Sequence, residues 1–133
     1  MARRFKRVIG VESDQHSALF AQRNAMDAGL PGVRIAPQPV EEWLELAYRS
    51  YGKPPFLLVD PPRAGLGPAV IRGIVRLRPA RIAYVSCDPS TLARDLKTLI
   101  TAGYAIEGVT GFDLFPQTHH VETVAHLARV DPE

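Results

Sequence analysis

Cys87 is the only cysteine of the chain. It is the last residue of an apolar run, RIAYVSC (81–87), and a segment that starts like a helix follows at Asp88. Unpaired N–H groups and the dipole at a helix N-terminus favour the thiolate, which is the nucleophilic form of cysteine. A lone cysteine is more often a small buried apolar residue. From its position alone, Cys87 is therefore either a nucleophile or a packing residue.

Carboxylates end two further apolar runs. Glu12 follows VIGV (8–11), where an acid can accept hydrogen bonds from ribose hydroxyls or cap the next helix. Asp60 opens the loop DPPRAG (60–65), in which Pro61 and its neighbour lack amide donors and have a fixed φ. Such a loop can hold a carboxylate and a planar ligand in place, although a simple proline turn has the same composition.

Glu122 is a candidate general base, and it stands in the apolar stretch VETV (121–124). A carboxylate with apolar neighbours binds protons more tightly than one in water and can serve as a base. If this stretch is a strand with one solvated face, simple alternation instead turns Glu122 toward solvent. The stretch by itself is compatible with both interpretations.

The elements that must position these residues alternate between short apolar runs and helical segments. Strands are expected at 7–12, 33–36, 56–60 and 81–87, and helices up to about residue 28, then at 40–50, 67–77 and 88–103. Two final strands, 104–116 and 119–130, are expected to form an antiparallel pair that closes the sheet. This order predicts an α/β fold with a mostly parallel sheet, whose ligands bind beyond the carboxyl ends of the strands.

The composition is typical of a globular protein that does not span a membrane. The chain has 133 residues, 46% of them hydrophobic, and a net charge of +2, which suits one globular domain and tolerates a polyanionic partner. No apolar run approaches the roughly 20 residues of a membrane span. One cysteine cannot form an internal disulfide, and the four histidines lack zinc-like spacing, so we expect a cytoplasmic protein without a metal site.

Three longer stretches are more specific than any of these residues alone: LLVDPPRAG (57–65), YVSCDPSTLARDL (84–96) and FDLFPQTHHVETV (112–124). Together they resemble the RNA uracil-C5-methyltransferase family, which makes 5-methyluridine in ribosomal and transfer RNA, and the resemblance runs over nearly the whole chain. It implies a Rossmann-like fold dependent on S-adenosylmethionine, an RNA partner, with rRNA favoured over tRNA, and a partial catalytic domain spanning residues 1–133.

The resemblance also implies roles for individual residues. Cys87 would add to carbon 6 of uracil, and Glu122 would remove the proton from carbon 5. Glu12 would bind the cofactor ribose, and Asp60 would line the cofactor and uracil site. On the substrate side, the loop around Pro61 would hold the base, and we expect Arg63 to stabilise negative charge near it.

The chain departs from the family where a first strand and its glycine-containing cofactor loop would precede residue 7. We therefore expect an unpaired edge along the strand at 7–12, and with it either dimerisation or marginal stability. A non-catalytic remnant that binds RNA or a protein is the alternative interpretation. A nucleotide-binding oxidoreductase ranks last, because it needs the same loop and gives Cys87 and Glu122 no role.

Overall fold

The computed structural model describes residues 1, 3–114, 116–118 and 121–130. Its elements follow in the order β1 (Val8–Val11), α1 (Gln15–Asp27), β2 (Val33–Ala36), α2 (Val40–Ser50), β3 (Phe56–Val59), α3 (Pro68–Leu77), β4 (Arg81–Ser86), α4 (Pro89–Thr101), β5 (Tyr104–Phe112) and β6 (Glu122–Arg129). The expected alternation of strands and helices is confirmed. The expectation that the last two strands extend over 104–116 and 119–130 is wrong at their facing ends, because β5 ends at Phe112, β6 begins at Glu122, and a turn with Gln117 at φ of +68° lies between them. Residues 115 and 119–120 lie outside the described residues.

Local signals in the sequence account for the ends of the helices. Asp14 caps α1 by accepting a hydrogen bond from the Ser17 amide, and Gly29, with φ of +63°, follows the end of that helix. Pro68 and Pro89 occupy the first positions of α3 and α4, where a missing amide donor costs nothing. The helices therefore begin and end within one or two residues of their predicted limits.

The chain forms two compact units, residues 1–46 and 47–133. In the first unit, β1 and β2 pair in parallel and α1 packs against β2. The four residues of β1 are half-buried, so the expectation of a buried strand at 7–12 is wrong. The reason is that β1 pairs on one side only among the described residues, which confirms the expected unpaired edge.

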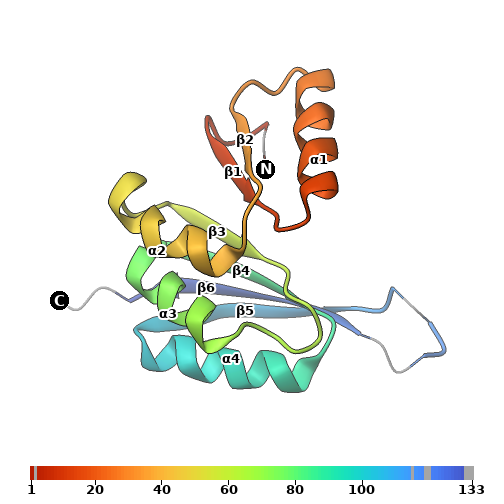
Figure 1. Cartoon of the computed structure of the whole chain (residues 1–133). Coiled ribbons are helices and arrows are strands. Elements are labelled where there is room, and N and C mark those ends of the chain that lie inside the picture. The colour runs from red at the N-terminus through yellow and green to blue at the C-terminus, as the bar shows by residue number, and fades with distance from the viewer. Residues whose placement is uncertain (2, 115, 119–120, 131–133) are drawn as a thin grey trace. The chain divides into compact units, whose positions relative to one another are not determined.

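The second unit contains a four-stranded sheet in the order β3-β4-β6-β5. β3 and β4 are parallel, whereas β6 runs antiparallel to both of its neighbours. The last strand of the chain therefore lies inside the sheet, between β4 and β5, and pairs with both (Figure 1). Antiparallel pairing of the two final strands is confirmed, but it is β5 that lies at the edge.

Helices α3 and α4 pack against each other, and α4 also packs on β5 (Figure 1). Apolar side chains of both helices are buried: Val70, Ile71, Ile74, Leu77, Leu92, Leu96 and Leu99. They form the core of this unit with Ile82, Tyr84 and Leu127 of the sheet, none of which is more than 1% exposed. This packing fixes α4, the helix that follows Cys87.

No helix in the described part of the chain is long and apolar enough to cross a bilayer.

Candidate active site

Three of the predicted site residues lie at one edge of the four-stranded sheet. Asp60 comes directly after β3, and Cys87 directly after the parallel strand β4. Ser86, the last residue of β4, pairs with Thr123 of β6, so Cys87 and Glu122 are the next residue outward on each strand. Because β6 is antiparallel, its beginning meets the carboxyl ends of β3 and β4. The topology thus brings a thiol and two carboxylates to the same edge.

Cys87 lies in a tight turn between strand and helix, and it is half-buried. The Ser86 hydroxyl spans this turn: it donates to the Asp88 carbonyl at 2.9 Å and accepts from the Asp88 amide at 3.1 Å. These two bonds join the residues on either side of Cys87. They restrict the backbone that carries the thiol.

Asp88 caps the helix that starts after Cys87. One carboxylate oxygen accepts from the amides of Ser90 and Thr91, each at 2.9 Å. Hydrogen bonds from the Ser90 side chain and the Thr91 backbone lower the pKa of the Asp88 carboxyl below its usual value. The amides that the sequence suggested as unpaired donors for a thiolate are therefore engaged by Asp88. The expectation that unpaired N–H groups at this helix start favour a Cys87 thiolate is therefore wrong for these two amides.

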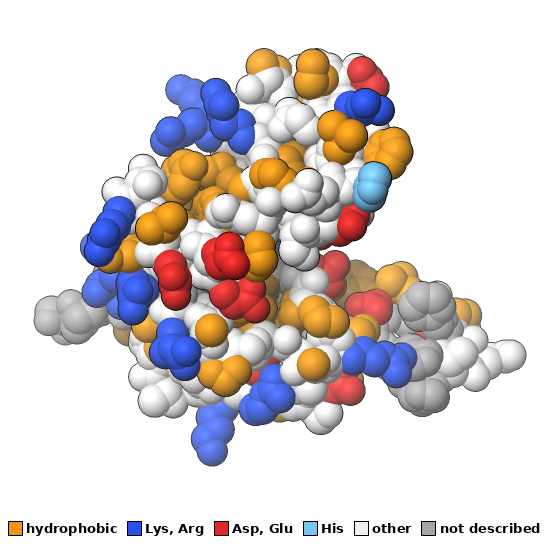
Figure 2. Space-filling model, viewed as in Figure 1, with side chains coloured by type: hydrophobic (Ala, Val, Ile, Leu, Met, Phe, Trp, Pro, Cys, Tyr) orange, Lys and Arg blue, Asp and Glu red, His pale blue; other side chains and the backbone are white. Residues whose placement is uncertain are grey.

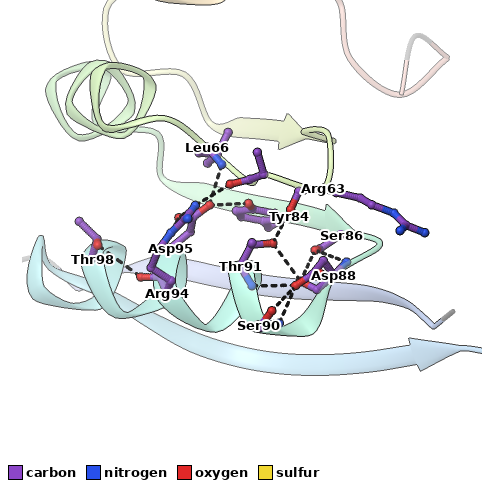
Figure 3. Close-up of polar contacts among 11 residues, drawn as sticks. Arg63, Leu66, Tyr84, Ser86, Asp88, Ser90, Thr91, Arg94, Asp95 and Thr98 are labelled. Atoms are coloured by element: carbon purple, nitrogen blue, oxygen red, sulfur yellow. Dashed lines mark hydrogen bonds and ion pairs between the residues drawn. The ribbon is translucent and has the colours of Figure 1, made fainter. Parts of the chain in front are cut away.

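The loop after β3 is held by α4 rather than by its prolines alone (Figure 3). The Thr91 hydroxyl donates to the Arg63 carbonyl at 3.0 Å, and the Arg94 guanidinium to the Ala64 carbonyl at 2.8 Å. Pro61 is half-buried and Arg63 exposed. The Arg63 side chain extends away from the cluster of polar contacts in Figure 3, and its backbone carbonyl is the group that Thr91 of α4 binds.

Asp95 lies at the centre of this cluster, although the sequence patterns had not predicted a role for it. Its side chain is 1% exposed and accepts from the Tyr84 hydroxyl at 2.7 Å and the Leu66 amide at 2.7 Å. Burial and this bond to Asp95 raise the pKa of the Tyr84 hydroxyl above its usual value, so Tyr84 stays a donor. The signal was present, because Asp95 follows Leu92 by three residues and thus shares the apolar face of the helix.

Glu12 lies in the first unit, at the carboxyl end of β1, and is half-buried. Its backbone amide donates to the Ala36 carbonyl at 3.1 Å, and its carboxylate accepts from the Asp14 amide at 2.8 Å. One oxygen of Glu12 therefore orders the turn into α1, in agreement with the capping interpretation. A carboxylate at a strand end also has the acceptor chemistry that ribose hydroxyls require.

Charge and metal-ligand chemistry add little to the definition of the site. Lysine and arginine side chains lie at several separate places on the face seen in Figure 2, so charge marks no single surface there. The described residues contain no group of three or more metal-ligating side chains. The candidate site is therefore defined by Asp60, Cys87 and Glu122 and by the loop that begins at Asp60.

Comparison with known proteins gives a consistent result. The family model described as tRNA (Uracil-5-)-methyltransferase matches residues 1–130. The chain is 45% identical over 126 residues to an uncharacterized RNA methyltransferase of Thermotoga maritima, covering 94% of this chain and 28% of that protein. It is 42% identical over 127 residues to the 23S rRNA (uracil(1939)-C(5))-methyltransferase of Edwardsiella ictaluri, covering 94% of this chain and 28% of that protein.

Among solved structures, the chain resembles the Pyrococcus abyssi tRNA (uracil-54, C5)-methyltransferase in complex with S-adenosyl-L-homocysteine. The TM-score is 0.77 at 36% identity, and the match covers 96% of this chain and 30% of that one. The chain thus spans less than a third of the length of these relatives.

Proposed function

The chain belongs to the tRNA (uracil-5-)-methyltransferase family, and it has the α/β fold of methyltransferases that depend on S-adenosylmethionine. On that premise we propose that it carries the active site for methylation of carbon 5 of a uridine in RNA. The observation that supports this most is the register of β4 and β6, which makes Cys87 and Glu122 the next residues beyond the Ser86–Thr123 pair. A nucleophile and a base are the two groups that this reaction needs.

The reaction requires a covalent step because carbon 5 of uracil is a poor nucleophile. The Cys87 thiolate adds to carbon 6 and pushes electrons toward carbon 5, which becomes nucleophilic like an enolate carbon. S-adenosylmethionine supplies the electrophilic methyl group that carbon 5 accepts. Glu122 then takes the remaining proton from carbon 5, and the electron pair of that C–H bond restores the ring double bond as the thiolate leaves.

The other predicted residues have roles around these two. Glu12 has the acceptor chemistry to bind the ribose of the cofactor, and Asp60 lies at the edge where cofactor and uracil would meet. Pro61 stiffens the loop that faces the base, and Arg63 stabilises negative charge on the ring. Residues 1–133 act together as one part of a catalytic domain.

We further propose that the substrate is ribosomal RNA rather than transfer RNA. The 42% identity over 127 residues to the rRNA enzyme of Edwardsiella ictaluri supports this preference. A half-buried thiol cannot reach a stacked base, so the uridine must be unstacked or flipped out of its helix. A lone cysteine stays reduced in the cytoplasm, where this chemistry would take place.

The direct test uses the complete gene product that contains this chain. It is incubated with S-adenosylmethionine and either 23S rRNA or a tRNA pool, and the digested nucleosides are analysed by mass spectrometry. We expect 5-methyluridine in the rRNA, and none when the cofactor is left out. RNA binding without 5-methyluridine would favour the alternative, a non-catalytic RNA-binding module. Methylation of tRNA alone would reverse the proposed substrate.

A separate prediction concerns residues 1–133 produced alone. Among the described residues β1 pairs with β2 alone, so its other side offers unpaired backbone donors and acceptors. We therefore expect this chain either to dimerise through that edge or to be marginally stable. Light scattering at several concentrations and a thermal melt measure both properties. A monomer at all concentrations that melts above about 65 °C would contradict the prediction.

A further inference from the structure

A buried carboxylate connects three parts of the second unit (Figure 3). One oxygen of Asp95 accepts from Leu66 in the loop after β3 and from Tyr84 in β4, each at 2.7 Å. The other oxygen accepts from Arg94 Nε at 3.0 Å and lies 2.9 Å from the second guanidinium nitrogen of that residue. A buried charge is costly unless it is fully paired, and here both oxygens have partners. The cluster therefore holds its members in one arrangement.

The loop after β3 is bound to α4 at successive residues, so that the order of the contacts along the loop matches their order along the helix. The carbonyls of Arg63 and Ala64 accept from Thr91 and Arg94, and the Leu66 amide donates to Asp95. Each bond uses a backbone group of the loop and a side chain of α4. Cys87 immediately precedes Asp88, the cap of α4, so the helix that holds the loop along its side also begins next to the thiol.

Gly65 shows how closely the loop approaches this pair of charges. Its φ is +75°, and a Cβ placed there would lie 2.5 Å from a carboxylate oxygen of Asp95 and 2.7 Å from a guanidinium nitrogen of Arg94. A glycine is needed both for the backbone angle and for the close approach. A side chain at this residue would therefore displace the charged pair between the two loop residues that Arg94 and Asp95 bind.

We propose that Asp95 is a positioning residue for the methyl transfer. It fixes the loop of residues 60–66 on α4, so that Asp60 keeps a set position relative to Cys87. Asp95 is buried and acts through the Leu66 amide and Arg94, without touching the substrate. This inference rests on the proposed function. It makes the reaction rate depend on Asp95, a residue that does not lie at the sheet edge with Cys87 and Glu122.

The test variant is Asp95→Asn in the complete gene product. The amide keeps the size of the side chain but loses the charge that pairs with Arg94 and one of its acceptor oxygens. Misplacement of a reacting group by about 1 Å costs on the order of 100-fold, so we expect kcat for uridine methylation to fall about 10- to 100-fold. The dissociation constant for RNA should change by less than about threefold, because the lost contact acts on the reaction step.

Two further variants separate positioning from stability. Tyr104→Phe removes another buried hydroxyl of the same unit, which donates to the Pro79 carbonyl at 3.0 Å away from the loop, and should leave kcat unchanged. Thr91→Val removes the hydroxyl that holds Arg63 and that also lies 3.2 Å from the Asp88 carbonyl, keeps the amide that Asp88 caps, and should lower kcat about three- to tenfold. It tests the same idea at a half-buried position should Asp95→Asn fail to fold. All variants are assayed well below their melting temperatures.

The outcomes distinguish this inference from the proposed function. Methylation by the wild type together with unchanged kcat in the Asp95 and Thr91 variants would overturn the positioning role and leave the function intact. Equal losses in Tyr104→Phe and Asp95→Asn would also overturn it, because loss of stability would then explain both. A wild type that makes no 5-methyluridine and no covalent RNA complex would overturn the function itself, and the inference with it.

Discussion

Cys87→Ala is expected to abolish both 5-methyluridine formation and the covalent complex between protein and RNA. Addition of the thiolate to carbon 6 is the step that activates carbon 5, and Cys87 is the only cysteine of the chain. Loss of a nucleophile of this kind lowers kcat by more than about 10⁴-fold. The variant should still bind RNA and remain folded, because the half-buried side chain fills little of the core.

The covalent complex can be trapped with RNA that carries 5-fluorouridine at the target position. Fluorine cannot leave carbon 5 as a proton does, so the methylated ring stays bound to the thiol. Trypsin cuts after Arg81 and Arg94, and the peptide between them, residues 82–94, contains the only cysteine of the chain. Mass spectrometry of that peptide locates the bond. A complex of equal yield in Cys87→Ala would rule out the proposed nucleophile.

Glu122→Gln is expected to increase the amount of covalent protein–RNA complex, whereas Cys87→Ala abolishes it. The amide cannot take the proton from carbon 5, so the ring remains methylated and attached to Cys87 even when the RNA carries ordinary uridine. Turnover should fall about 10²- to 10⁴-fold, the usual contribution of a positioned base. A denaturing gel should therefore show more covalent complex than the wild type gives, together with less 5-methyluridine.

Glu107→Gln is the matched control for this variant. Glu107 lies on β5 and forms a 3.5 Å ion pair with Arg81 at the surface, where such pairs contribute little. Its removal should leave turnover and complex formation unchanged. If Glu122→Gln turned over at the wild-type rate, Glu122 would be an ordinary strand residue. If it gave neither product nor complex, it would be needed before proton removal.

The first four strands and their ends could be predicted from the sequence because they depend on local patterns. An apolar run that stops at Asp60 or Cys87 places those side chains at a carboxyl end whatever the rest of the chain does. The position of β6 could not be predicted in this way. Its pairing with β4 joins residues 81–86 to 123–128, and alternation along a strand does not specify which partner it takes.

The limits of prediction at the site have the same origin. The sequence predicts that a helix starts at Asp88, but the occupation of the Ser90 and Thr91 amides follows only from the conformation of the Asp88 side chain. Asp95 interrupts an apolar stripe, which indicates a buried acid, yet its partners Leu66 and Tyr84 come from distant parts of the chain. The local sequence carries a signal for such a residue, but its role becomes evident only from its tertiary contacts.

The insertion of β6 between β4 and β5 has a consequence for biosynthesis. The strand that carries Glu122 is translated after both of its neighbours, which must wait with unpaired facing edges until residues 122–129 arrive. A transcript with a premature stop before this point would give a product that lacks the proposed base and also the middle of its sheet. Such a product would be a substrate for proteases rather than a weakly active enzyme.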